Sequence, residues 1–228
     1  MARIIQQMAR KGSQYWLQIV VNQMADVLND KLRRHLRLAD SVSITWLSPL
    51  VEDGFAEYRD DDFLDRLDVL PLKRSLESFW PRGGPVWDGL ARTSRGDVIL
   101  LEAKSHIPEM LSTCKACPAS LRLIQDSLAE TAAFYGSSSP DCWPDAYYQY
   151  ANRLAYHYWL RHLNGIPAWL VFLHFVNDDE MGGPRSEHEW QVAIEAAHDH
   201  LGIASVRLRP HVVDVFVDVK MLTETERM

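Results

Sequence analysis

The chain has 228 residues, 47% of them hydrophobic, and its 24 lysine and arginine residues against 31 aspartate and glutamate residues give a formal net charge of −7. This length and composition are typical of a globular protein with an ordinary hydrophobic core. The negative charge excludes the global basic field of proteins that hold nucleic acid by charge alone. No apolar run reaches the roughly 18 residues of a membrane span, so no membrane partner is expected.

Three cysteines bear on the compartment: Cys114, Cys117 and Cys142. An odd number of cysteines, without a hydrophobic secretory segment near the first residue, predicts reduced thiols and a cytoplasmic location. Cys114 and Cys117 have the spacing of a zinc knuckle. No second pair with ligand spacing follows them, so this pattern does not favour structural zinc.

The first third of the chain contains a long amphipathic segment. Over residues 13–38 apolar side chains recur at spacings of three and four, which predicts a helix with Ser13 as its N-cap. Alternating β-branched and polar residues predict a strand over 41–47. The acidic segment 60–67 predicts a short exposed helix or loop, and residues 73–79 predict another short helical turn.

Strands and helices alternate through the rest of the chain. The predicted strands are 86–92, 98–104, 168–176, 205–208 and 212–219, and the predicted helices are 112–134, 146–163 and 187–201. The run 168–176 is almost wholly apolar, which is typical of a central strand covered on both faces. This order favours one α/β domain over residues 1–228, with a sheet between two helical layers.

The hairpin formed by the strands 86–92 and 98–104 brings charged residues together. With a three-residue loop ending in Gly96, the strand register places Asp88 opposite Glu102, with their Cβ atoms about 5 Å apart. Lys104 projects from the same face as Glu102. Two opposed carboxylates suit a hard divalent cation such as Mg²⁺, which prefers oxygen ligands. The same spacing also fits an ordinary ion pair between Glu102 and Lys104.

Asp88, a hairpin and then Glu102, Ala103 and Lys104 resemble the motif of the PD-(D/E)XK nuclease superfamily. The resemblance implies a restriction-endonuclease-like core over about 13–177, a three-layer α/β/α sandwich around a mixed sheet, with a C-terminal helix and strand extension over 186–220. It also implies that Asp88, Glu102 and the Ala103 carbonyl bind Mg²⁺ or Mn²⁺, and that Lys104 activates water.

The sequence departs from the superfamily pattern at two places, the residue before Asp88 and the first predicted helix. Trp87 stands where the motif has proline. Many members add an acidic side chain from the first helix, and the resemblance implies that Asp26, or Asn22 as a polar substitute, takes this place.

The predicted helix 146–163 presents polar residues at spacings of three and four, among them Gln149 and Arg153. In the superfamily the corresponding helix often lines the active site, which implies that Gln149 and Arg153 contact the substrate phosphate. A solvent-facing polar stripe is the alternative. Six aromatic residues on the same helix predict a core or a dimer interface.

The sequence therefore predicts a Mg²⁺- or Mn²⁺-dependent nuclease that hydrolyses phosphodiester bonds, with DNA favoured over RNA. A homodimer or a protein partner is compatible with this class. Two alternatives remain: a non-catalytic module of nuclease fold that binds nucleic acid or a protein partner, and an ordinary α/β domain whose hairpin mimics the motif.

Overall fold

The computed structural model describes residues 3–225, and side chains of residues 3–223. A five-stranded sheet of order β2-β4-β5-β6-β7 forms its centre, and β1 pairs with β3 in a small second sheet. The strands are β1 (Arg3–Ile4), β2 (Ile44–Ser48), β3 (Glu57–Tyr58), β4 (Gly89–Thr93), β5 (Val98–Lys104), β6 (Ala168–Val176) and β7 (Val212–Asp218). The helices are α1 (Gly12–Gln23), α2 (Ala25–His35), α3 (Asp60–Leu67), α4 (Pro118–Tyr135), α5 (Tyr148–Tyr158), α6 (Glu187–Leu201) and α7 (Val219–Thr225).

The central sheet is mixed. β2, β4 and β5 form an antiparallel meander, and β5, β6 and β7 run parallel to one another. Strand β6 lies between β5 and β7, and all its side chains but Trp169 are buried. Its bounds and its burial on both faces confirm the central strand predicted from its continuous apolar run.

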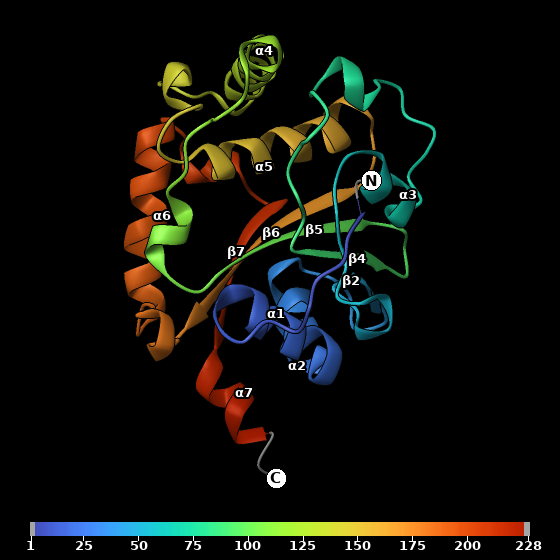
Figure 1. The fold of residues 1–228 in the computed structure, drawn as a ribbon, viewed down its shortest axis with the longest axis vertical. Coiled ribbons are helices and arrows are strands. Elements are labelled where there is room, and N and C mark those ends of the chain that lie inside the picture. Colours follow the sequence, from blue (N-terminus) through green and yellow to red (C-terminus); the bar gives the residue numbers. More distant parts are fainter. Residues whose placement is uncertain (1–2, 226–228) are drawn as a thin grey trace.

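Helices cover both faces of the central sheet (Figure 1). Side chains alternate between faces along β5, so Ile99 and Leu101 pack against α1 and α2, whereas Leu100 packs toward α4 and α5. The layered arrangement of a mixed sheet between helices is thus the one predicted. The helix α6 adds a smaller cluster in which Trp190 and Ile194 contact the end of β6.

The N-terminal helix differs from the prediction. A single helix over 13–38 was expected, but the chain leaves helical geometry at Met24, with φ −138° and ψ 35°, and continues as α2. Leu17 and Val20 on α1 and Leu28 and Leu32 on α2 are all fully or almost fully buried. The change of direction allows both helices to bury their apolar faces against the sheet, which periodicity alone does not reveal.

Three further elements differ in extent or exposure. Residues 205–208 form a 3₁₀ turn instead of a strand, closed by a hydrogen bond from Arg207 N to Ala204 O, because four residues are too few to distinguish the two. The helix predicted over 112–134 begins only at Pro118, which suits a first helical position. The acidic helix α3 is only partly exposed, since Phe63, Leu64 and Leu67 are buried.

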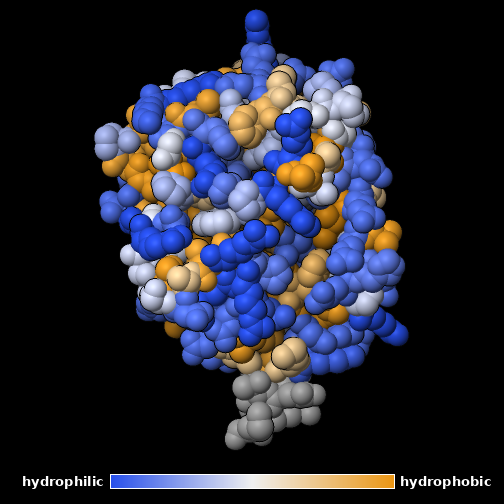
Figure 2. Space-filling model, turned by 180° about the vertical axis from the view of Figure 1, so that it is seen from behind, coloured by the Kyte–Doolittle hydropathy of each residue, from blue (hydrophilic) through white to orange (hydrophobic). Residues whose placement is uncertain are grey.

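The surface opposite to the view of Figure 1 is mainly hydrophilic, and hydrophobic residues form small separate groups on it (Figure 2). Within residues 3–225, no helix combines the length and the hydrophobicity needed to cross a membrane.

Candidate active site

The β4–β5 hairpin has the predicted register. Gly89 pairs with Leu101 and Arg92 with Val98, and Thr93 N donates a hydrogen bond of 2.9 Å to Asp97 O. Gly96 has φ +88°, the left-handed geometry expected at the end of the three-residue loop. Continuing the register by one pair places Asp88 opposite Glu102. The Asp88 Oδ2 atom accepts a hydrogen bond of 2.8 Å from Ala103 N, which fixes the carboxylate at the end of β5.

Glu102 lies at the centre of a buried ion cluster. Only 2% of its surface is exposed, and its two carboxylate oxygens bind different cations. Lys104 Nζ lies 2.6 Å from Oε1, while Arg153 Nε and Nη2 lie 2.6 and 2.5 Å from Oε2. Burial opposes the charged form, but the charges of Arg153 and Lys104 outweigh it and lower the pKa of Glu102.

Asp88 has the opposite electrostatic environment. Burial raises its pKa to about 8, and the negative charge of Glu102 adds to this effect, while Lys104 and Arg153 oppose it. Asp88 is therefore largely protonated at neutral pH in the metal-free protein. Burial tends to lower the pKa of Lys104, but Glu102 and Asp88 raise it overall, so the ammonium retains its proton.

Arg153 is buried, so the alternative of a solvent-facing stripe on α5 is wrong at this position. Its side chain is 3% exposed, its Nη2 donates to Val86 O at 2.7 Å, and its guanidinium carbon lies 4.8 Å from the centre of the Trp87 ring. Gln149 also reaches the cluster, because its Oε1 accepts a hydrogen bond of 3.1 Å from Lys104 Nζ. The structure thus brings both predicted substrate-binding residues to the predicted catalytic residues.

The aromatic residues of α5 belong largely to the core, as predicted. Tyr150, Tyr156 and Tyr158, followed by Trp159, are buried beneath the helices α3 and α4. Arg153 is a buried charged residue on the same helix, where its Nη1 also donates to Asn152 Oδ1 at 3.0 Å. Its burial follows from the tertiary partner Glu102, which the helical spacing alone cannot indicate.

A third carboxylate near the cluster was missed by the sequence analysis. Glu57 on β3 is 9% exposed and accepts hydrogen bonds from Gln14 on α1 at 2.9 Å and from Gln6 at 3.2 Å. Burial raises its pKa, and the charge of Glu102 contributes to the increase. A two-residue strand in an acid-rich segment offers no periodic signal, so only the fold identifies Glu57.

The residues expected from the first helix lie elsewhere. Asn22 Nδ2 donates to Pro49 O and its Oδ1 accepts from Val51 N, both at 2.8 Å, so its amide fixes a loop. Asp26 is exposed in the first turn of α2. Among the described residues no hydrogen bond or ion pair joins either side chain to Asp88, Glu102 or Lys104, because the amide of Asn22 is used by the loop and by Gln18 O, and Asp26 points to solvent. Gln14 is the residue of α1 that reaches toward the site, through Glu57.

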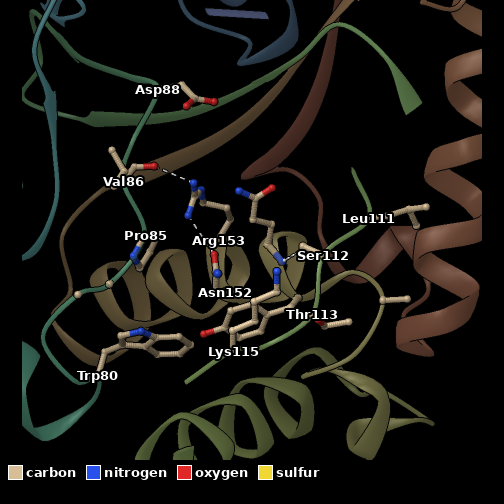
Figure 3. Close-up of a pocket in the computed structure, with 15 residues that line it drawn as sticks. Trp80, Pro85, Val86, Asp88, Leu111, Ser112, Thr113, Lys115, Asn152 and Arg153 are labelled. Carbon is tan, nitrogen blue, oxygen red and sulfur yellow. Dashed lines mark hydrogen bonds between the residues drawn. The ribbon is translucent and has the colours of Figure 1, made fainter. Parts of the chain in front are cut away.

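Asp88 and Arg153 line a cleft of about 830 Å³ (Figure 3). Residues 80–88 form one wall, residues 111–115 form the other, and the start of α5 forms the floor. Its volume lies in the range of ligand-binding clefts. Glu102 and Lys104 lie beside it, within the ion cluster that Arg153 completes.

The side chains of the cluster are chemically suited to bind a small hard cation. Two carboxylates that meet at a strand end, one with a strongly raised pKa, would both gain from a divalent ion, and Mg²⁺ commonly takes one or two carboxylates and several waters. In the metal-free protein Lys104 and Arg153 supply the positive charge beside Glu102. Within the described part of the chain, no three or more His, Cys, Asp or Glu side chains are grouped to hold a metal ion.

Comparison of the chain with family models, with curated proteins and with solved structures found no match. The functional assignment therefore depends on the geometry of the cluster and of its cleft.

Proposed function

We propose that this protein is a metal-dependent nuclease that hydrolyses phosphodiester bonds, with DNA favoured over RNA as substrate. The observation that carries the proposal is the arrangement of side chains at the end of β5: Asp88, one residue before the Gly89–Leu101 pair, accepts a hydrogen bond from Ala103 N, and Lys104 binds Glu102 at the same strand end. An apolar interior has little use for two opposed carboxylates, since their repulsion destabilises the fold. The position of Asp88 in the lining of a cleft, with Glu102 beside it, supports a catalytic role.

Asp88, Glu102 and the Ala103 carbonyl are the proposed ligands of Mg²⁺ or Mn²⁺. A cation bound there would polarise a phosphoryl oxygen and lower the pKa of a coordinated water. For Glu102 to act as a ligand, at least one of its oxygens must exchange Lys104 or Arg153 for the cation, and Asp88 must lose its proton. The cationic side chain released from that oxygen then becomes available to other negatively charged groups.

Lys104 and Arg153 are the proposed partners of the reacting phosphate. Lys104 would orient the attacking water by hydrogen bonding, and once released from Glu102 its ammonium would give up a proton more readily. The water oxygen would form a bond to phosphorus and lose a proton, while the bond from phosphorus to the leaving oxygen breaks and that oxygen takes up a proton. Arg153, with Gln149 beside Lys104, would stabilise the negative charge that develops on the phosphoryl oxygens.

A second candidate is a non-catalytic module of the same fold that binds nucleic acid or a protein partner, as a monomer or a homodimer. The closed ion cluster favours it, because Lys104 and Arg153 already neutralise Glu102 without a metal ion. This candidate predicts that divalent cations leave the cluster unchanged.

Titration calorimetry with Mn²⁺, followed by cleavage assays on single- and double-stranded DNA and RNA, tests the proposal. We expect wild-type protein to bind Mn²⁺ saturably and to cleave, and Asp88→Ala and Glu102→Gln to lose both properties. Asp126→Asn, which changes an exposed carboxylate on α4, serves as the matched control and should behave like wild type. Binding without cleavage would keep the metal site and refute the nuclease, whereas no Mn²⁺ binding by a folded wild-type protein would refute the metal site and favour the second candidate.

A further inference from the structure

The cleft beside Asp88 offers few free positive charges. Of the cationic side chains that line it within the described residues, Lys115 is exposed, whereas Arg153 is buried against Glu102 and Val86. One rim also contains a carboxylate, because Asp60 accepts hydrogen bonds from Gly83 N and Gly84 N. Duplex DNA is normally held by many Lys and Arg contacts along its phosphates. The cleft therefore lacks the main means of holding a duplex.

The floor of the cleft instead presents aromatic and amide groups. Tyr148 and Asn152 lie one helical turn apart on α5, so both face the cleft from the same side of the helix. The Tyr148 ring is half-buried, so part of it packs against neighbouring side chains and the rest is open to the cleft. An aromatic ring held at the base of a cleft is a stacking surface for an unpaired base.

The two walls restrict what can reach Asp88. Trp80, Pro85 and Val86 stand on one side and Leu111 to Thr113 on the other, with Asp88 at the end of the first wall (Figure 3). In a duplex the faces of the bases are covered by stacking and are not available to a side chain between such walls. A single strand exposes both its bases and its phosphates, so it can meet the floor and Asp88 together.

We propose that the substrate of this site is a single-stranded polynucleotide, which lies along the cleft with one base stacked on Tyr148 and an adjacent phosphate at Asp88. This inference rests on the proposed nuclease function and specifies its substrate class. Lys115 on the opposite wall contacts a second phosphate. Single-stranded DNA and RNA both offer unpaired bases beside phosphates. The affinities measured for each of them show which one the cleft prefers.

Fluorescence anisotropy tests this inference with a labelled oligonucleotide, as single-stranded DNA, as single-stranded RNA and as duplex DNA of the same sequence. EDTA in every sample prevents metal-dependent cleavage. We expect at least one single strand to bind wild-type protein about tenfold more tightly than the duplex, and Tyr148→Ala to weaken that binding by about tenfold. Tyr148→Phe keeps the ring and should bind within about threefold of wild type.

Salt dependence provides a second measurement. With few phosphate contacts, the logarithm of the single-strand affinity should fall only slowly with the logarithm of the salt concentration. Lys115→Gln should reduce this slope by about 0.7, the value for one phosphate contact on a single strand. Thermal unfolding of each variant establishes that the fold is retained.

Equal or tighter binding of the duplex, no binding of any oligonucleotide, or unchanged binding by a folded Tyr148→Ala variant would each overturn the inference. The outcomes that would refute the nuclease function differ from those that would refute the single-stranded substrate. Asp88-dependent cleavage of duplex DNA without single-strand preference would retain the nuclease and reject the single-stranded substrate. Tyr148-dependent binding of single strands without any metal-dependent cleavage would retain the single-strand binding site and reject the nuclease.

Discussion

Glu102 places a negative charge where almost no water reaches, and the fold neutralises it with two cations. Lys104 comes from the same strand and Arg153 from α5, so the ion cluster joins the sheet to the helical layer above it. A buried charge that loses one partner is strongly destabilising, whereas removal of a whole pair is often tolerated. The cluster is therefore a structural connection as well as the centre of the proposed site.

Replacement of Arg153 by methionine should destabilise the protein by about 3 kcal/mol, because Glu102 would keep only Lys104 as a partner. Urea unfolding in EDTA measures the change. The double variant Glu102→Gln/Arg153→Met removes the charge of Glu102 together with its partner. It should recover most of the unfolding free energy that Arg153→Met loses. Arg34→Met, on the exposed side of α2, is the matched control and should change stability by less than about 0.5 kcal/mol. A double variant as unstable as the single one would contradict this account.

Asp88 should make the metal-free protein less stable as the pH rises. Its pKa is about 8 in the folded protein and near 3.8 in its ordinary state, so folding favours the protonated form. The stability that this group contributes is complete below pH 3.8 and is lost as the pH rises through 8. Asp88→Asn keeps an oxygen acceptor for Ala103 N and does not titrate.

We therefore expect Asp88→Asn to exceed wild type in unfolding free energy by more than about 1 kcal/mol at pH 8 in EDTA, with a smaller difference at pH 5. Mn²⁺ should raise the stability of wild type at pH 8 and leave the variant unchanged, because a ligand stabilises only the folded state that binds it. Chemical unfolding at both pH values provides the measurement. A difference independent of pH would show that Asp88 does not titrate in this range.

At the scale of elements, Asn22 connects α1 to the loop that follows β2. Its amide hydrogen-bonds to Pro49 O and Val51 N, and also to Gln18 O on its own helix. Asn22→Ala should destabilise the protein by about 1 to 3 kcal/mol, since the two loop groups lose their partner. Calorimetric Mn²⁺ binding should remain unchanged, which separates this structural role from the metal-binding role expected from the sequence. Asp26→Ala, at an exposed position, is the control for both measurements.

Elements with strong local signals were predicted with their observed bounds. β5 begins with four consecutive apolar residues and β6 is almost wholly apolar. The helix α6 begins after Ser186, whose hydroxyl accepts a hydrogen bond from Glu189 N, and ends before Gly202. The helix break at Met24 and the short strand of Glu57 depend on distant contacts. No period or cap in the sequence identifies them.

The candidate site was also predictable only where local sequence rules determine it. Asp88 and Glu102 were paired by counting from a three-residue hairpin loop, which is a local rule. The burial of Arg153 and the approach of Glu57 arise from contacts between residues separated by dozens of positions, here with Glu102 and Gln14. Sequence reasoning therefore placed Asp88, Glu102 and Lys104 together, but indicated neither the burial of Arg153 against Glu102 nor the approach of Glu57.

At the scale of the whole molecule, the core between the sheet and α4 contains a neutral histidine. His157 on α5 is 2% exposed, its Nδ1 lies 2.9 Å from the Tyr135 hydroxyl and its Nε2 lies 3.2 Å from Ala168 O. The carbonyl requires a proton on Nε2, so Nδ1 accepts from the hydroxyl and the ring is neutral. Burial lowers the pKa of His157 to about 3.

This histidine should make the whole fold sensitive to mild acid. The unfolded chain binds a proton at His157 below pH 6.5, whereas the folded protein does not bind one until about pH 3, so stability is lost as the pH falls between these values. At pH 5 the loss amounts to about 2 kcal/mol. Protonation of Asp88 acts in the opposite direction over part of this range, so the total change in wild type is not diagnostic.

Comparison with His157→Gln isolates the effect. The variant should be less stable than wild type at pH 7.5, because glutamine cannot reproduce both hydrogen bonds, but should lose about 2 kcal/mol less between pH 7.5 and pH 5. Urea unfolding at the two pH values measures both quantities, and equal denaturant slopes would show that both proteins expose the same surface on unfolding. Parallel losses in the two proteins would mean that His157 accepts a proton inside the folded core, which its burial opposes more strongly than the hydrogen bond to Ala168 O favours it.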